Sequence, residues 1–200
     1  MKFLSDAMFW LSNGLLVPVI IGLLYLFVRS VFLLGTLFGT WIRHNKIKRS
    51  FAPIMEGADE KSIDQLKQEV TKIDLPAGFV VTAKRLFTSD EATANLLVSE
   101  YELTSENKLG MAKILVKFGP ILGLMGTLIP MGPALVGLST GDIANMAYNM
   151  QVAFATTVLG LFSSAIGFVA THMMRQYNHR CLIWLDYLND RISEESSKGE

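Results

Sequence analysis

The 200-residue sequence is poor in the side chains that most enzymes use for chemistry, with one cysteine and three scattered histidines. The single cysteine, Cys181, excludes an internal disulfide and a zinc site built from cysteines. No H-E-x-x-H, G-x-x-x-x-G-K-[S/T], G-x-S-x-G or G-x-G-x-x-G motif occurs. With 18 basic and 18 acidic residues the net charge is +0, so no basic footprint suggests nucleic acid. We therefore expect no enzyme, no metal and no cofactor.

Charge is also missing from two long stretches. Residues 7–42 and 114–174 contain only three charged residues, which are Arg29, Lys117 and Asp142. A soluble fold distributes charge over its exposed faces and cannot hide so many apolar residues in so short a chain. A membrane protein with charged appendages can. The sequence therefore predicts an all-α membrane protein.

The apolar tracts divide into three segments that are long enough to cross a bilayer. They run over residues 14–42, 114–138 and about 143–173. A helix rises about 1.5 Å per residue and the hydrocarbon core is about 30 Å thick, so each segment can cross once. Residues 139–142 indicate a tight turn, with Asp142 as the N-cap of the third span.

Lysine and arginine cluster after the first span, before the second and after the third, whereas the turn has neither. The positive-inside rule then places the N-terminus outside and the C-terminus in the cytoplasm. We divide the chain into an N-terminal segment with the first span (1–42), a cytoplasmic helical region (43–113), the second span (114–138), a turn with the third span (139–174) and a cytoplasmic C-terminal helix (175–200).

The charged segments predict helical extensions of the spans. Residues 59–73 are typical of an amphipathic helix, which Leu75–Gly78 would end. Ser89–Glu91 indicates the start of a helix that continues into the second span, because no proline intervenes. The tail has one apolar stripe, formed by Cys181, Leu185, Leu188 and Ile192.

The second and third spans are rich in small residues at four-residue spacing. The pairs are Gly119 with Gly123, Gly160 with Ser164, and Ser163 with Gly167. Such pairs let helix backbones approach closely in lipid. They serve packing of the second span on the third, and a further interpretation is packing against copies of the same chain.

Hydroxyl groups provide most of the remaining polarity in the spans. Thr157 and Ser164 share one narrow face of the third span with small residues, and Thr127 lies midway along the second span. Each hydroxyl can simply bond a carbonyl of its own helix. A whole stripe that matches Thr127 favours the alternative, a polar lining. For Arg29, snorkelling to a headgroup and facing the helix bundle, paired with a partner's carboxylate or a lipid phosphate, are both open.

The second and third spans contain no Asp or Glu apart from Asp142 in the turn. A protein that carries protons usually needs a titratable group near the membrane midplane. If this chain conducts protons, the carboxylate must come from another polypeptide.

Two segments of the spans carry a family resemblance. Residues 118–131 read FGPILGLMGTLIPM and residues 153–161 read AFATTVLGL. They resemble the A-P-L-L-G-L-L-G-T-V-x-G-M and A-L-x-x-T-A-x-G-L signatures of the ExbB/TolQ/MotA proton-channel family. Pro120, residues 123–127 and Thr157 carry the match. Three crossings with one large cytoplasmic loop are similar to the ExbB/TolQ branch.

The resemblance implies a proton-channel or stator subunit of a membrane motor driven by an ion-motive force. In that family five copies form a ring in the inner membrane around a single-span ExbD/TolR/MotB-like partner, whose Asp carries the proton. Val152 stands where ExbB-type members have an acidic residue. A non-conducting scaffold that assembles other membrane proteins is the alternative, and proton and sodium are both open.

The resemblance and the hydroxyl stripe together identify candidate site residues. The ion pathway is assigned to Thr127, Thr157, Thr156 and Ser164. Helix packing is assigned to Gly119, Pro120, Gly123, Gly126, Gly160 and Gly167.

Overall fold

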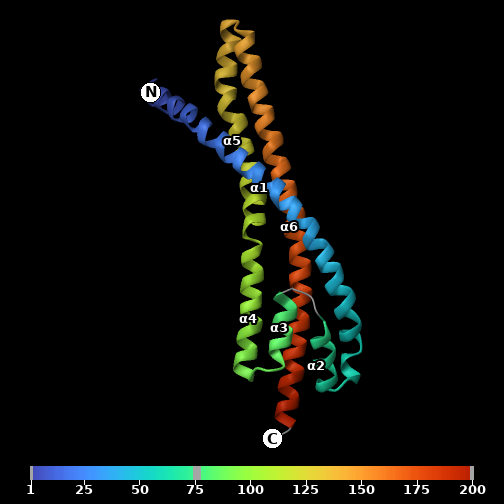
Figure 1. Cartoon of the computed structure of the whole chain (residues 1–200). Coiled ribbons are helices and arrows are strands. Elements are labelled where there is room, and N and C mark those ends of the chain that lie inside the picture. The colour runs from blue at the N-terminus through green and yellow to red at the C-terminus, as the bar shows by residue number, and fades with distance from the viewer. Residues whose placement is uncertain (1, 74–77, 199–200) are drawn as a thin grey trace. The chain divides into compact units, whose positions relative to one another are not determined.

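The computed structural model describes residues 2–73 and 78–198, and this part of the chain is helical almost throughout (Figure 1). No strand occurs within it, which confirms the all-α prediction. The elements are α1 (Lys2–Glu56), the 3₁₀-helix η1 (Ala58–Glu60), α2 (Ile63–Lys72), α3 (Gly78–Leu86), α4 (Glu91–Lys108), α5 (Gly110–Thr140) and α6 (Ile143–Lys198).

Three helical stretches of the described chain are long and apolar enough to cross a membrane. They are Ala7–Glu56 in α1, Glu91–Thr140 in α4 and α5, and Ile143–Glu195 in α6. Each is about 75 Å long at 1.5 Å per residue, whereas the hydrocarbon core is about 30 Å thick, so only part of each stretch lies in lipid. The chain is therefore a multi-pass membrane protein with helices that extend beyond the bilayer.

A two-residue turn joins α5 to α6. Gly141 has a φ of +78°, which favours glycine, and the Asp142 N–H donates to the Gly137 carbonyl at 2.8 Å. Together with the bond from the Gly141 N–H to the Leu138 carbonyl, this forms a Schellman motif. The Asp142 carboxylate then accepts from the Asn145 N–H at 3.0 Å, which confirms it as the N-cap of α6. The turn is shorter than predicted because α5 continues to Thr140.

The chain folds as two compact units, which we describe separately. The apolar unit contains α1 up to Thr36 together with residues 111–171, and the charged unit contains residues 37–110 and the chain from His172 onward. In the apolar unit many large apolar side chains are exposed, among them Phe32, Leu124 and Phe154. This surface composition suits contact with lipid tails rather than water.

The charged unit has a hydrophobic core of its own, so its helices are more than solvated extensions. Phe51 from α1 and Phe79 from α3 are fully buried, with ring centroids 4.6 Å apart. The buried residues of the cluster are Ile47, Phe51, Val70, Phe79, Val80, Ala83, Leu86, Ala94, Leu97, Val98, Cys181, Leu185 and Leu188. Helices α1, α2, α3, α4 and α6 all contribute to this core.

Helix α2 begins at Ile63, four residues later than predicted, because Ser62 forms a capping box with Gln65. The Ser62 hydroxyl accepts from the Gln65 N–H, and the Gln65 side chain accepts from the Ser62 N–H. The residues before it form η1. Of the predicted break, Leu75–Ala77 lies outside the described residues, and Gly78 is the first residue of α3.

Helix α4 begins at Glu91 with Asp90 as its N-cap residue, which confirms the predicted start. It does not run unbroken into the second span. A one-residue interruption at Leu109, whose N–H donates to the Glu106 carbonyl three residues back, separates α4 from α5. The prediction missed it because leucine favours the helix, so the residue type gives no sign of an interruption. The Leu109 side chain is buried.

The apolar stripe of the tail packs into the core of the charged unit, as its spacing predicted. Cys181, Leu185 and Leu188 are buried, and Ile192 packs against them. The stripe belongs to the same helix as the third span. Burial raises the pKa of the Cys181 thiol, so little of the reactive thiolate forms at neutral pH.

We expect Leu185→Ala to loosen this core and expose Cys181. Removing a fully buried leucine costs about 2–5 kcal/mol, so the rate at which a maleimide modifies the lone thiol should rise at least about tenfold. The measurement is a labelling time course of the purified protein in detergent. Ile183→Ala removes a side chain that is 53% exposed and should leave the rate unchanged. Equal labelling of all three proteins would contradict a packed core at this position.

Candidate functional site

The site in the apolar unit is built on a close contact between the backbones of α5 and α6. A Cβ atom added at Gly160 would lie 2.5 Å from the Gly119 carbonyl oxygen, and one added at Gly119 would lie 2.7 Å from the Gly160 carbonyl oxygen. Real Cβ atoms do not approach so closely. Two of the predicted packing glycines therefore lie directly opposite each other, where only glycine fits.

The contact continues on either side of this pair. A Cβ atom at Gly126 would lie 2.6 Å from the Thr156 hydroxyl oxygen, and one at Gly167 would lie 2.7 Å from the Leu115 Cβ. At Gly123 the same added atom would be at an ordinary contact distance of 3.5 Å from the Gly160 Cα. The two helices thus approach closely along several turns.

Pro120 explains why a serine lies opposite it. Proline has no N–H, so the carbonyl of Val116 four residues earlier loses its helical partner. The Ser164 hydroxyl on α6 donates to this Val116 oxygen at 3.2 Å. A hydroxyl on a neighbouring helix therefore satisfies the carbonyl that the proline frees, as the proline-rich second span requires in lipid. Ser164 thus lies in the helix contact, as its pairing with Gly160 predicted, and its assignment to the ion pathway stays a prediction.

Thr156 also lies between the two helices. It is 5% exposed, and its hydroxyl donates to the Ala153 carbonyl at 2.9 Å while it packs against Gly126. The adjacent Thr157 is half-buried and donates to the same Ala153 carbonyl at 3.0 Å. The adjacent threonines therefore have different surroundings, and Thr157 is the more accessible of the two.

Thr127 resembles Thr157 in its hydrogen bonding. It is half-buried on α5, and its hydroxyl donates to the Leu124 carbonyl at 2.7 Å. A hydroxyl that has given its hydrogen to its own helix can still accept a hydrogen bond. Thr127 and Thr157 are thus polarised as acceptors.

Arg29 is exposed on α1, and its Nε donates to the Tyr25 hydroxyl at 3.2 Å. The guanidinium carbon lies 5.8 Å from the centre of the same ring. The Arg29 side chain therefore lies along the surface of α1 against a tyrosine one turn earlier.

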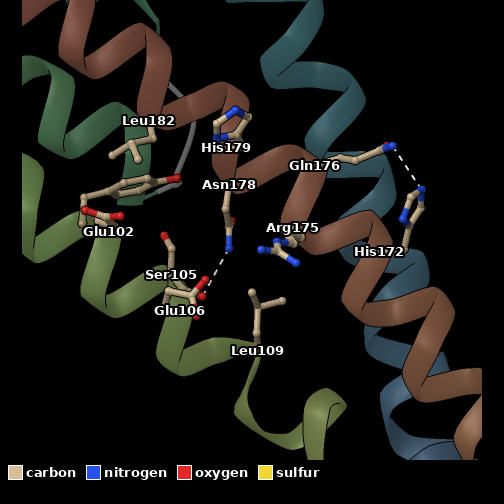
Figure 2. Close-up of a pocket in the computed structure, with 11 residues that line it drawn as sticks. Glu102, Ser105, Glu106, Leu109, His172, Arg175, Gln176, Asn178, His179 and Leu182 are labelled. Carbon is tan, nitrogen blue, oxygen red and sulfur yellow. Dashed lines mark hydrogen bonds between the residues drawn. The ribbon is translucent and has the colours of Figure 1, made fainter. Parts of the chain in front are cut away.

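The sequence analysis missed a polar cavity in the charged unit. It lies between α4 and α6, has a volume of about 520 Å³ and is shown in Figure 2. Its walls carry Glu102 and Glu106 from α4, and His172, Arg175 and His179 from α6. Within the described residues no group of three or more histidine, cysteine or acidic side chains could hold a metal ion.

A hydrogen bond joins the two walls of this cavity. The Asn178 side chain on α6 donates to the Ser105 carbonyl on α4 at 3.2 Å. The spacing of Glu102 and Glu106, one helical turn apart, was the available signal for the cavity, but a predicted solvated face accounts for such a pair equally well.

A comparison with protein-family models matches the chain to the family described as the MotA/TolQ/ExbB proton channel family. The match covers residues 77–184, which is more than half of the chain. It includes the close contact between α5 and α6 and the threonines on both helices. No curated protein matches the chain significantly.

We expect Gly160→Ala to destabilise the apolar unit, because its methyl group would meet the Gly119 carbonyl oxygen at 2.5 Å. Overpacking of this kind costs about 1–3 kcal/mol. Thermal unfolding in detergent measures the loss. Gly35→Ala on α1 is the matched control, since nothing lies within 4 Å of its added Cβ and alanine is the better helix former. A Gly160→Ala protein as stable as the control variant would rule out the close contact.

We expect the effect of Ser164→Ala to depend on Pro120. In the natural sequence the change leaves the Val116 carbonyl without a donor and should cost about 1 kcal/mol. With Pro120→Ala the residue at position 120 regains an N–H for that carbonyl, so Ser164→Ala should then cost much less. A double-mutant cycle by thermal unfolding measures this coupling.

Ser163→Ala is the control for the cycle, because the Ser163 hydroxyl donates to the Leu159 carbonyl of its own helix at 2.8 Å. Its cost should be the same with proline or alanine at position 120. The assignment fails if Ser164→Ala also costs the same in both backgrounds.

Proposed function

Because the chain belongs to the MotA/TolQ/ExbB proton channel family, we propose that it is the multi-copy subunit of a motor in the inner membrane. The ion-motive force across that membrane powers the motor. In this proposal five copies form a ring around a single-span partner of the ExbD/TolR type. The N-terminus lies outside, and the charged unit lies in the cytoplasm. A carboxylate of the partner, rather than any group of this chain, carries the proton.

The absence of acids from the spans supports a proton carrier supplied in trans. Between residues 114 and 174 the only acidic residue is Asp142, and its carboxylate caps α6 in the turn at one end of the span. Threonine and serine do not titrate in the physiological range, so they can guide a proton carrier but cannot replace it.

The hydrogen bonds of Thr127 and Thr157 carry the proposal further. Each hydroxyl donates to a carbonyl of its own helix, so each offers an acceptor to a neighbouring molecule. A protonated carboxylic acid has a hydrogen to donate, whereas a carboxylate only accepts. The two threonines would therefore favour the neutral form of the partner's Asp as it passes through the dehydrated part of the ring.

The close contact between α5 and α6 supports the same proposal, because it makes the helix pair rigid. Paired glycines and the bond from Ser164 to Val116 hold the two helices together along several turns. A partner that rotates or rocks against this pair needs a wall that does not deform under load. We propose that Thr156 and Ser164 serve this wall, while Thr127 and Thr157 serve the pathway.

The energies involved are comparable. A proton that crosses a potential of ~150 mV releases about 3.5 kcal/mol. Removal of one hydrogen-bond partner from a buried polar group costs about 1–3 kcal/mol. A single hydroxyl at the ring face could therefore decide whether the available potential drives the cycle.

We expect Thr157→Ala to reduce proton flux when the chain is co-expressed with its single-span partner. The loss should be about tenfold, because about 1–3 kcal/mol of acceptor stabilisation is removed from the neutral acid. Thr157→Ser retains an acceptor and should restore most of the flux. The measurement is the pH change inside cells or proteoliposomes after a potential is applied.

Thr171→Ala is the matched control, because Thr171 lies further along α6 and its hydroxyl also bonds a carbonyl of its own helix. A second arm replaces the partner's Asp by Asn and should abolish the flux. Full flux in both Thr157→Ala and the partner variant would reject the proposed function. Stable assembly with the partner but no ion dependence of its activity would favour the non-conducting scaffold.

A further inference from the structure

Two adjoining cavities lie between α1 and α6 in the charged unit. Their volumes are about 600 Å³ and 390 Å³, and both are lined by Lys48, Arg180 and Trp184. Cavities of this size accommodate small organic ligands. Because they share these residues, we call the two cavities together the α1/α6 groove.

The groove presents two basic side chains, Lys48 and Arg180, that form no ion pair within the described residues. Both are exposed. One carboxylate, Glu56, lines only the smaller cavity. Asn45 and Gln176 add amide groups to the larger one. A basic pair with neutral donors beside it is suited to a phosphate group.

The wall of the larger cavity is apolar and aromatic at the end nearer the spans. Trp41 and Met173 contribute to it. The His44 ring lies flat on the Tyr177 ring, with centroids 3.5 Å apart and planes within 6°. The groove therefore combines a surface for hydrocarbon with a site for an anion, which is the arrangement of a phospholipid.

The position along the chain places the basic pair at the depth of lipid phosphates. The first apolar tract ends at Ile42, and Lys48 follows about 9 Å further along α1 at 1.5 Å per residue. Arg180 follows the third tract, which ends near Met173, by a similar distance. The interfacial layer on each side of a bilayer is about 5–8 Å thick, and long basic side chains reach back toward it. Both residues follow odd-numbered spans, so they emerge on the same side of the membrane.

We propose that the α1/α6 groove is a binding site for an anionic phospholipid, with its phosphate held by Lys48 and Arg180 and the start of its acyl chains on Trp41. Basic grooves between helices at the membrane surface recognise such headgroups. The site is independent of the ion pathway, because it uses no residue of the contact between α5 and α6. It would make this part of the protein sensitive to the lipid composition of one leaflet.

The test uses the tryptophans of the groove as reporters. The full chain carrying Trp10→Phe retains only Trp41 and Trp184, and it is placed in phosphatidylcholine nanodiscs. Brominated phosphatidylglycerol or brominated phosphatidylcholine is then added in increasing mole fraction, because bromine quenches a tryptophan that it touches. We expect half-maximal quenching at about 30-fold lower mole fraction for phosphatidylglycerol, since two basic residues contribute.

The variant Lys48→Gln with Arg180→Gln should remove this preference, and Lys48→Arg with Arg180→Lys should keep it. Lys67→Gln with Lys72→Gln changes the net charge equally on exposed residues of α2 and should also keep it. An unchanged midpoint of thermal unfolding in detergent shows that each variant is folded.

Three results would overturn the proposal. Equal quenching by the two lipids would mean ordinary contact with bulk lipid. A preference that survives in the double glutamine variant would place the anion elsewhere. Relief of quenching by excess inorganic phosphate would mean that the groove selects a free phosphate ion and not a lipid.

Discussion

The apolar unit depends on the approach of α5 and α6 to within backbone contact. Apolar side chains gain little by leaving lipid tails for one another, so a helix pair in a membrane is held by packing and by hydrogen bonds. Gly119 and Gly160 lie opposite each other with no room for a methyl group, and Ser164 donates to the Val116 carbonyl across the same contact. Pro120 removes one hydrogen bond from α5, and the carbonyl that it frees is the one that accepts a hydrogen bond from α6. These features lie within the residues that the family match covers.

The two units are stabilised by different physical terms. In the charged unit water is the solvent, so burial of Phe51, Phe79 and Leu185 supplies the main stabilisation, and α2 and α3 add side chains that α1, α4 and α6 alone would lack. The hydrophobic effect therefore adds little to the packing of these helices in lipid but stabilises their packing beyond the bilayer. Helix α6 serves both settings, with small residues and hydroxyls between 153 and 167 and a stripe of cysteine and leucine from 181.

Much of this architecture follows from the sequence, because charge and hydropathy act over long stretches. The three spans, the helical class, the N-cap Asp142 and the tail stripe were predicted from such patterns, and the structure confirms them. The start of α2 depends on the capping box of Ser62 and Gln65, and the interruption at Leu109 on a local backbone hydrogen bond, neither of which periodicity reveals. Thr156 and Thr157 are neighbours in the sequence. Which of them is packed and which is accessible depends on the face that α6 turns toward α5, and the sequence does not show this. The α1/α6 groove could not be predicted, because the sequence does not show which helices pack against each other.

The Gly141 turn has a consequence for how this chain can vary. Surface connections usually tolerate inserted residues, because their length does not determine what the flanking elements contact. Here the connection consists of Gly141 and Asp142, whose N–H groups bond back to α5, so it determines the axial stagger of the whole hairpin. One added residue would advance α6 by about 1.5 Å and 100°. The side chain of Leu159 would then take the place of Gly160 opposite the Gly119 carbonyl, where not even a methyl group fits, so the length of this two-residue connection is fixed by a contact several turns away.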